Sequence, residues 1–400
     1  MTPSPLQQKL VSLTSEVNGL FVGRAHEVEC AITALLSNEH AVFVGVPGCA
    51  KSMVVDQLSK RIGDAEYFWL QLFAETAPSD VFGQISLRAL ETEDVNRRNT
   101  RGHLPACHIG FLDEIFQARS SILVGCNAIM QERKYMNGHA KVDAPIRSLF
   151  GASNFFPEDE QLVALWDRFL LRRRVEPLSS DEDIRAMLVA PEPPENPAPV
   201  VSLAELDAAH KAAMSVLVGK DVLDGFMEVL AKMAALQQPI NVSDRRKKKA
   251  WKLLRARAWL NGRTEVTTGE FPVLGYAFWN KPEDIAPIEA LLADYAPVEG
   301  DKITAVIDAL RPSIANLAKL RSAGLGMEQH KPAVMALLSN VNEVIADLKQ
   351  YEARSLTDLS TQKILADSKV MLRATQRDLY IDMNVDVDAF APPTSLGKGR

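Results

Sequence analysis

The segment from Gly45 to Ser52 holds the clearest arrangement for chemistry, because glycines, a lysine and a hydroxyl stand close together in GVPGCAKS. An apolar run precedes it and a helical pattern follows it. Backbone N–H groups of such a loop, and of the helix N-terminus after it, converge on phosphate oxygens. Lys51 would bring positive charge to the β- and γ-phosphates, and the Ser52 hydroxyl would bind Mg²⁺. We therefore predict a phosphate loop that contacts ATP through Gly45, Pro47, Gly48, Cys49, Ala50, Lys51, Ser52 and Met53.

Ala50 departs from the usual pattern, in which a glycine precedes the phosphate-loop lysine. A methyl group is acceptable at this position if the residue keeps a negative φ, which is what we expect for Ala50. The alternative interpretation of the segment is a strand, a turn and a helix that bind nothing. We favour the phosphate loop because the segment follows a predicted strand and opens a predicted helix, which is the context that such a loop requires.

Two adjacent carboxylates, Asp113 and Glu114, end the apolar run at 108–114. Carboxylates at the end of a buried strand are costly unless they face a metal ion or solvent. Beside a phosphate loop, Asp113 can hold Mg²⁺ through water, and Glu114 can take a proton from the attacking water. The alternative is a strand that ends at a polar loop, and the motif is weak without the phosphate loop before it.

Asn154 ends the next apolar run, RSLFGASN at 147–154. Ligands of parallel sheets bind at the carboxyl ends of the strands, so an amide at this position can orient the attacking water. The alternative is an asparagine that caps a helix or forms a turn.

Arginines are the remaining candidates, since phosphoryl transfer places negative charge on the γ-phosphate oxygens. Arg168 follows the predicted sheet, and Arg245 and Arg246 begin a basic helix. The usual alternative for each is a solvated surface cation. The basic run Arg245–Lys249 has a further alternative as a nucleic-acid contact, which is a modest signal in an acidic chain.

Apolar strands alternate with helices in the first half of the chain, which predicts an α/β fold with a parallel sheet covered by helices on both faces. The predicted strands are 41–45, 67–73, 108–114 and 147–154, and the predicted helices are 1–20, 25–37, 51–62 and 118–132. Two segments interrupt the alternation. Residues 83–105 are a polar insertion, and residues 134–143 predict a hairpin around Asn137-Gly138.

The second half of the chain is predicted to be helical. The expected domains are an α/β nucleotide-binding domain at 1–190, a proline-rich linker at 191–201, a helical lid at 202–282, a helical C-terminal domain at 283–384 and a flexible tail at 385–400. Lid helices are expected at 202–215, 221–236 and 243–261. An apolar stripe from Val334 to Tyr351 predicts a further helix, against which 302–321 and 358–380 can pack.

Composition is that of an ordinary globular protein, with 400 residues and a formal net charge of −6. This charge argues against a dedicated nucleic-acid binder. The four cysteines have no zinc or disulfide spacing and predict a reducing compartment. We find neither a signal peptide nor an apolar stretch long enough to span a bilayer, so we expect a cytoplasmic protein without a membrane span.

Several of these segments resemble the MoxR-type AAA+ ATPases, and most closely their RavA-like branch. The segments are FVGRAHEVE at 21–29, GVPGCAKS at 45–52, FLDEI at 111–115, GASN at 151–154, WDRF at 166–169 and LLRRRV at 170–175. The resemblance covers about residues 20–265. The RavA-like branch tolerates alanine before the phosphate-loop lysine.

The resemblance implies a role for each matching residue. Lys51 and Ser52 would be the Walker A pair, Asp113 and Glu114 the Walker B pair, and Asn154 sensor 1. Arg168 would be the arginine finger, which reaches the ATP of a neighbouring subunit. Arg245 would be the sensor 2 arginine of the lid, with Arg246 as the fallback, and Val22 and Gly23 would lie against the base of the nucleotide. We expect ATP to bind between the α/β domain and the lid of one subunit.

The resemblance also implies an assembly and a task. Family members usually form hexameric rings, act with a partner that carries a von Willebrand A domain, and remodel or mature a protein complex. The RavA-like branch can carry a small β-rich insertion, for which we see no strands beyond residue 285. Two alternatives stay open, namely a nucleic-acid motor or defence-system regulator, and a nucleotide-gated scaffold with little turnover.

Overall fold

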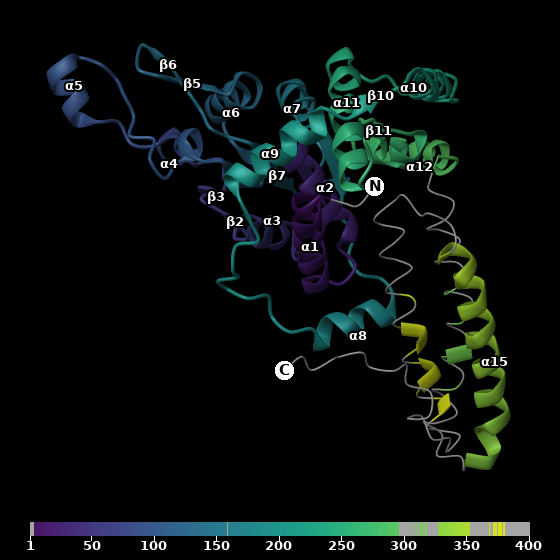
Figure 1. The fold of residues 1–400 in the computed structure, drawn as a ribbon. Helices are drawn as coiled ribbons and strands as arrows, with labels where there is room; N and C mark the ends of the chain where they lie inside the picture. The colour runs from purple at the N-terminus through teal and green to yellow at the C-terminus, as the bar shows by residue number, and fades with distance from the viewer. Residues whose placement is uncertain are drawn as a thin grey trace, which may run out of the picture. The chain divides into compact units, whose positions relative to one another are not determined.

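The structure is a computed structural model that describes residues 4–157, 159–295 and 327–352. It also describes single positions at 307, 310, 313–314, 317, 368, 371–373, 375–377 and 379–380. The chain divides into two compact units, residues 1–295 and 296–400 (Figure 1). The expected tail at 385–400 lies outside the described residues, as does most of the segments 302–321 and 358–380.

Unit 1 contains a parallel sheet, several short strands and two groups of helices. Its strands are β1 (Ala41–Val44), β2 (Ile62–Gly63), β3 (Tyr67–Gln71), β4 (Ile109–Asp113), β5 (Lys134–Asn137), β6 (Ala140–Asp143), β7 (Ser148–Ser153), β8 (Leu171–Arg174), β9 (Val201–Ser202), β10 (Leu217–Val218) and β11 (Glu265–Val266). Its α-helices are α1 (Pro5–Leu20), α2 (Ala25–Ser37), α3 (Lys51–Ser59), α4 (Pro78–Phe82), α5 (Leu87–Glu93), α6 (Ser120–Glu132), α7 (Glu160–Trp166), α8 (Asp181–Val189), α9 (Leu203–Met214), α10 (Lys220–Ala234), α11 (Asp244–Leu260) and α12 (Ile285–Ala293). Short 3₁₀ helices are η1 (Leu104–Ala106), η2 (Ile115–Gln117), η3 (Thr268–Tyr276) and η4 (Pro282–Asp284).

The main sheet has the strand order β3-β4-β7-β1-β8, and every neighbouring pair is parallel. The expected α/β fold is therefore confirmed, and all four predicted strands are present. The fifth strand, β8, was not predicted, because LRRR has no apolar pattern although Leu171 and Arg172 are both buried. The predicted helix at 51–62 is shorter than expected, since α3 ends at Ser59 and Ile62 pairs with Val201 of β9.

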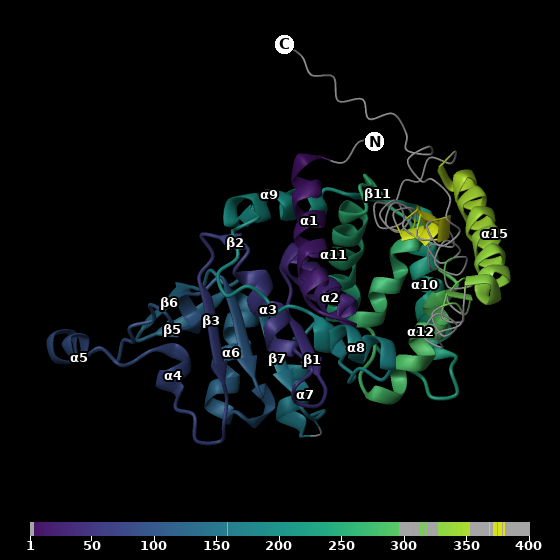
Figure 2. The same ribbon diagram turned by 90° about the horizontal axis from the view of Figure 1, so that it is seen from below.

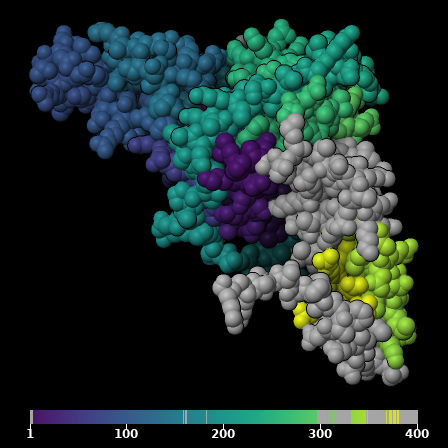
Figure 3. Space-filling model, in the orientation of Figure 1, coloured from purple at the N-terminus to yellow at the C-terminus, as the bar shows by residue number. Residues whose placement is uncertain are grey.

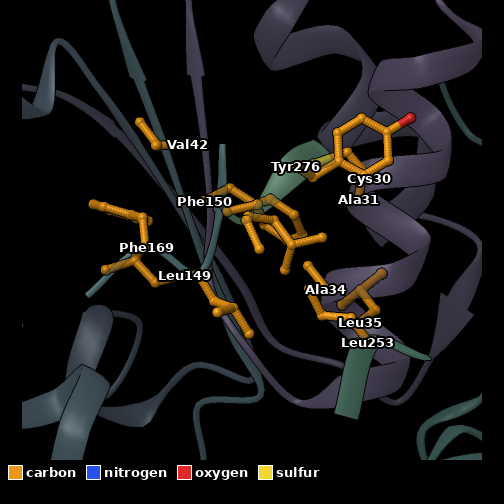
Figure 4. Packing of buried hydrophobic residues seen from close by; sticks show 14 of the residues in the cluster. Cys30, Ala31, Ala34, Leu35, Val42, Leu149, Phe150, Phe169, Leu253 and Tyr276 are labelled. Atoms are coloured by element: carbon orange, nitrogen blue, oxygen red, sulfur yellow. The ribbon is translucent and has the colours of Figure 1, made fainter. Parts of the chain in front are cut away.

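Helix α2 packs closely on the sheet because alanines line the face that meets it. Figure 4 shows Phe150 of β7 facing Ala31, Ala34 and Leu35, all of which are buried. Small side chains allow the helix axis to approach the strands, and the aromatic ring fills the space between them. Val42 and Leu149 point to the other face of the sheet, where Figure 4 shows them beside Phe169.

The carbonyl groups at the end of α2 are satisfied by three segments that are distant in sequence. The Ser148 hydroxyl donates to Ala34 O at 3.2 Å, Arg147 Nη1 donates to Leu35 O at 3.3 Å, and His210 Nδ1 contacts Leu36 O at 2.7 Å. Helix ends leave such carbonyls without partners inside the helix, and burying them unpaired is costly. This end of α2 therefore ties the sheet and helix α9 together.

The two insertions form one arm, which we define as residues 83–105 and 134–143. The second of them is the predicted hairpin, with Gly138 at a φ of +66° in its turn. Asn137 accepts from Arg98 N at 2.6 Å and donates to Arg98 O at 3.0 Å, so the two insertions are joined. Figures 1 and 3 show this arm, with α5 at its tip, projecting from unit 1.

Helices α9, α10 and α11 match the three helices expected between residues 202 and 261. Figure 2 shows α11 beside α1 and α2, and Glu39, which follows α2, accepts from Lys249 and Lys252 at 2.6 Å each. Helix α12 packs on η3 and α10, so unit 1 continues to Tyr295, past the boundary expected after residue 282. Residues 191–200 have no regular structure.

Unit 2 has a core of its own around helix α15 (Met327–Glu352). The predicted apolar stripe is buried at Val334, Leu337, Val341, Val344 and Leu348, where it packs with Leu310, Leu317, Leu372 and Leu379. These four partners lie in the two segments expected to pack against the stripe. Within the described part of the chain, no helix is both long enough and apolar enough to cross a bilayer.

His40 gives the stability of unit 1 a defined dependence on pH. The ring is fully buried, accepts from Leu149 N at 2.9 Å and lies 3.0 Å from Met130 O. Burial, reinforced by the charge of Arg133, holds the pKa of His40 well below its usual value. Because the folded state resists protonation, its stability is complete above the pKa of the unfolded chain and is lost as the pH falls.

We therefore expect the free energy of unfolding to fall by about 1.4 kcal/mol from this group between about pH 7.5 and about pH 5.5, given an unfolded pKa of about 6.5. Urea unfolding followed by tryptophan fluorescence measures it, since all five tryptophans lie in unit 1. His40→Gln should be less stable at every pH but should lose this part of the slope. An unchanged slope would contradict the assignment.

Candidate active site

Three strands carry the candidate residues to one edge of the sheet. The phosphate loop follows β1, Glu114 follows β4, and Asn154 follows β7. Strand β7 lies between β1 and β4, with Val44 paired to Ser153 and Leu112 paired to Gly151. Adjacent strands are only about 4.8 Å apart, so the side chains that follow them meet above the carboxyl edge.

The phosphate loop requires glycine at two positions for different reasons. A Cβ on Gly45 would lie 2.1 Å from Val175 O, because the backbone of β8 continues along this residue. Gly48 has a φ of +82° with open space around it, so its need for glycine is conformational. Pro47 and Gly48 are exposed at the crest of the loop, Cys49 is buried beneath it, and Met53 is exposed on α3.

Ala50 does not keep the negative φ expected for it. Its φ is +59°, in the left-handed region, immediately before α3 begins. This region costs a residue with a Cβ about 1 kcal/mol, because Cβ approaches the carbonyl oxygen. The loop therefore keeps the backbone shape that glycine usually supplies, and the alanine is strained in it.

Lys51 is held inside the loop by neutral acceptors. Its ammonium donates to Gly45 O, to Val46 O at 3.0 Å and to Asn154 Oδ1 at 3.2 Å, and the residue is 8% exposed. Burial lowers the pKa of Lys51, while nearby Asp113 opposes that shift. Among the described residues, no carboxylate pairs directly with the ammonium, so its charge is available to a phosphate.

Both carboxylate oxygens of Glu114 accept hydrogen bonds from amide side chains. Asn154 Nδ2 donates to Glu114 Oε1, and Gln117 Nε2 donates to Glu114 Oε2 at 3.2 Å. Glu114 itself has a φ of +50° and is buried, and its N–H donates to Asp113 Oδ1 at 3.0 Å. Lys51, Asn154 and Glu114 thus form one hydrogen-bonded network, which brings three of the predicted site residues together.

Gln117 was missed by the sequence analysis. It stands three residues after Glu114, and η2 turns its amide back toward the carboxylate. A polar residue at this spacing after an acid is a weak signal, because only a tight turn gives it this direction.

Asp113 and Ser52 are both half-buried, at the end of β4 and in the first turn of α3. Among the described residues, no group of three or more histidines, cysteines or carboxylates could hold a metal ion. One carboxylate and one hydroxyl still suit Mg²⁺, which keeps several waters and takes further oxygens from phosphates. The donor set of this site therefore fits Mg²⁺ with a nucleotide and does not fit a metal held by protein alone.

Val22 and Gly23 lie beside the segment that borders the phosphate loop. A Cβ on Gly23 would lie 2.5 Å from Leu178, and Arg24 Nη1 donates to Glu176 O at 2.9 Å. Residues 175–178 continue from β8, whose end touches Gly45. The predicted contact of Val22 and Gly23 with the base stays a prediction.

Arg168 and Arg245 lie near one another, at the opposite edge of the sheet. Arg168 precedes β8, and Leu171 N donates to His40 O at 3.1 Å, before β1 begins. Helix α11 starts at this same edge, since Lys249 and Lys252 reach Glu39. Four residues of strand, roughly 13 Å, separate this edge from the phosphate loop. Arg245 therefore does not lie over the nucleotide of its own chain, which differs from the expected arrangement.

Arg246 and Arg172 are buried and serve the joint between the sheet and the lid. Arg246 donates to Ala277 O at 3.0 Å and to Asn280 Oδ1 at 2.6 Å. Arg172 donates to Trp166 O at 3.0 Å and to Trp279 O at 2.5 Å. Burial lowers the pKa of Arg246 to about 10 and holds that of Arg172 well below its usual value. Because Arg246 is committed to these acceptors, Arg245 is the better candidate for a phosphate contact.

Aromatic rings connect the site with this joint. The ring centroid of Trp166 lies 6.0 Å from that of Phe116 and 5.3 Å from that of Trp279 of the lid. Phe116 follows Glu114 by two residues. Phe156, two residues after Asn154, lies 5.9 Å from Trp279. No pattern in the sequence predicted this cluster, since its members come from four separate segments.

Comparisons with known proteins point to one family. A family model described as the MoxR domain in the MoxR-vWA-beta-propeller ternary systems matches residues 8–213, and an AAA lid domain model matches residues 221–292. An uncharacterised protein of Methanocaldococcus jannaschii is 35% identical over 73% of this chain and 75% of its own. The protein named chaperone MoxR1 of Mycobacterium tuberculosis is 28% identical over 42% of this chain and 44% of its own. The crystal structure of a candidate ATPase from Cytophaga hutchinsonii has a TM-score of 0.59 at 17% identity and covers 72% of this chain and 94% of its own.

The strain at Ala50 can be measured directly. We expect Ala50→Gly to stabilise unit 1 by about 1 kcal/mol, because glycine adopts the left-handed conformation without the Cβ penalty. Urea unfolding followed by tryptophan fluorescence is the measurement. Ala208→Gly, at an exposed position inside α9, is the matched control and should destabilise by about 1 kcal/mol. Equal effects of the two substitutions would show that Ala50 carries no strain.

Proposed function

The chain belongs to the MoxR family of AAA+ ATPases, and we propose that it binds and hydrolyses ATP at the network of Lys51, Asn154 and Glu114. The network is the observation that carries the proposal. It joins a buried cation, an amide and a buried carboxylate at the edge of a parallel sheet where ligands bind. Phosphoryl transfer to water needs a cation for the phosphates, a group that orients the water and a base, and these three residues supply them.

The described residues act as follows in this proposal. The ammonium of Lys51 turns from the carbonyls of Gly45 and Val46 to the phosphates, which are stronger acceptors. Asn154 then loses Lys51 as a donor and orients the attacking water. Glu114, fixed by Gln117 at one oxygen, accepts the proton of that water at the other. Ser52 and Asp113 would hold Mg²⁺, which neutralises charge on the phosphate oxygens when it is bound.

We propose that Arg168 and Arg245 both act on the ATP of a neighbouring subunit. Their position at the edge opposite the phosphate loop supports this, because one chain cannot bring both ends of its sheet to one nucleotide. A closed ring, hexameric as in the family, would supply each site with the arginines of the next subunit. An arginine finger raises the turnover rate by about 10³–10⁵-fold, so an isolated subunit would hydrolyse ATP slowly.

We further propose a chaperone that remodels a protein complex with a von Willebrand A domain partner. The matched MoxR domain is described in systems that contain such a partner, and one relative is named a chaperone, which supports the proposal. The RavA-like assignment rests on the quoted motifs. The projecting insertion arm is the proposed client contact. A cytoplasmic location is consistent with four buried, unpaired thiols.

The nucleic-acid alternative is not favoured by any contact of the basic helix α11. Lys249 and Lys252 pair with Glu39, Arg257 pairs with Glu29 at 2.6 Å, and Lys247 pairs with Asp244 at 3.0 Å. Lys249, Lys252 and Arg257 thus join α11 to the segment of α2 and Glu39, whereas the pair of Lys247 lies within α11.

Two substitutions separate nucleotide binding from turnover. Lys51→Ala should abolish ATP binding, because it removes the cation of the loop. Glu114→Gln should keep binding and lower the rate of phosphate release by at least about 100-fold, because it removes the base. Binding of a fluorescent ATP analogue and phosphate release are the two measurements. Normal turnover in both variants would remove the site assignment.

Mixing experiments test whether the arginines act on a neighbour. Arg168→Ala and Arg245→Ala should each be nearly inactive alone, as should Lys51→Ala. Adding Lys51→Ala subunits, whose arginines are intact, should restore either arginine variant to about one quarter of the normal rate by random pairing in a ring. If Arg245 served its own chain instead, only Arg168→Ala would be restored.

A further inference from the structure

Asp167 stands where the end of α7 meets the first turn of the lid helix α11. Its carboxylate accepts from the Ser243 hydroxyl at 3.1 Å and lies 3.6 Å from Arg245 Nη1. It also lies 3.8 Å from Arg246 and 3.9 Å from Arg172. Arg168 follows it directly in the chain. One acid therefore lies within 4 Å of Arg245 and of the two buried arginines of the joint, and it directly precedes Arg168.

Electrostatics explain why an acid is needed at this position. Four arginines converge here, and Asp167 and Asp284 are the acids that offset the charge of Arg172 and Arg246. Arg168 is half-buried, and burial and the charge of Arg245 lower its pKa. The charges of Arg168 and Arg245 repel one another, and the charge of Asp167 opposes that effect at Arg168.

Hydrogen bonding gives the same residue a hold on the lid. Ser243 is the N-cap of α11, and its hydroxyl accepts from Arg246 N at 3.4 Å. That hydroxyl donates its own proton to Asp167, so the first turn of α11 is tied to the residue before Arg168. The side chain of Asp167 is 30% exposed, which leaves room for a neighbour's nucleotide to approach.

We propose that Asp167 is a positioning residue that holds Arg168 and Arg245 as one pair, so that both reach the same γ-phosphate of the neighbouring subunit. The inference rests on the proposed function, since it needs both arginines to act on a neighbour. Asp167 itself does not touch the nucleotide. The lid and the end of α7 then deliver their cations together, and rotation of the lid in one subunit changes the site of the next.

Steady-state kinetics test the role of Asp167. Asp167→Asn keeps a group that can bond Ser243 but loses the charge, and it should lower kcat roughly tenfold with the KM for ATP changed less than about twofold. Asp167→Glu keeps the charge and should recover most of the loss. Asp244→Asn is the matched control, because it removes an acid from the same helix turn where the side chain is 97% exposed and pairs with Lys247. An equal loss in Asp244→Asn would overturn the inference.

Mixed rings separate this inference from the proposed function. Arg168→Ala subunits are combined with Lys51→Ala subunits, or with subunits that carry Lys51→Ala and Asp167→Asn together. We expect the single variant to restore phosphate release and the double variant to restore roughly one tenth as much. No restoration by the single variant would remove the proposed action on a neighbour. Equal restoration by both would leave that action standing and overturn the role of Asp167.

Tryptophan fluorescence during urea unfolding guards against a folding defect. The Lys51→Ala subunits with and without Asp167→Asn should unfold at the same urea concentration. Size-exclusion chromatography should show that both enter rings in equal amounts. If the subunits with Asp167→Asn unfold at a lower urea concentration, subunits that carry Lys51→Ala and Asp167→Glu replace them in the comparison. Full restoration of phosphate release by the Asp167→Glu subunits supports the role of the charge. Restoration no greater than that by the Asp167→Asn subunits contradicts it.

Discussion

The order of the strands is the constraint on which the site depends. Strand β7 comes after β4 in the chain but lies between β1 and β4 in the sheet. Asn154 therefore stands between the loop that carries Lys51 and the turn that carries Glu114, and it bonds both. Had β4 paired directly with β1, the amide would lie outside the pair of charges. A parallel sheet with this order makes the network a result of the fold, because each loop only has to follow its strand.

The two edges of the sheet have different tasks. The carboxyl edge gathers the groups that we propose to bind phosphate and activate water, and the amino edge gathers Arg168, Arg245 and Asp167. The joint between β8 and the lid supports the second group. Arg172 and Arg246 are buried there, where backbone carbonyls accept their hydrogen bonds and the carboxylate of Asp167 lies within 4 Å of both. Charges buried in this way are costly to leave unpaired, so the joint has a single favourable arrangement.

Backbone strain is found at the same edge as the predicted chemistry. Ala50 and Glu114 both have positive φ although neither is glycine. At Glu114 this conformation begins η2, which turns Gln117 back to the carboxylate. At Ala50 it sets the direction of α3, whose first residue is Lys51. Such strain persists only where surrounding structure holds it, and here the buried strands β1 and β4 do so.

Local patterns in the sequence determined the phosphate loop, the acid pair, the four apolar strands, the hairpin and the lid helices. Each of these depends on residues close together in the chain, such as the apolar run before Gly45 or Asn137-Gly138 in its turn. Tertiary structure alone decided the strand β8, the φ of Ala50, the amide of Gln117 and the edge at which Arg245 lies. These features depend on contacts between segments far apart in sequence. Arg172 shows the physical reason most clearly, since an arginine that reads as a surface cation becomes fully buried once Trp166, Phe169 and Trp279 offer it their carbonyl groups.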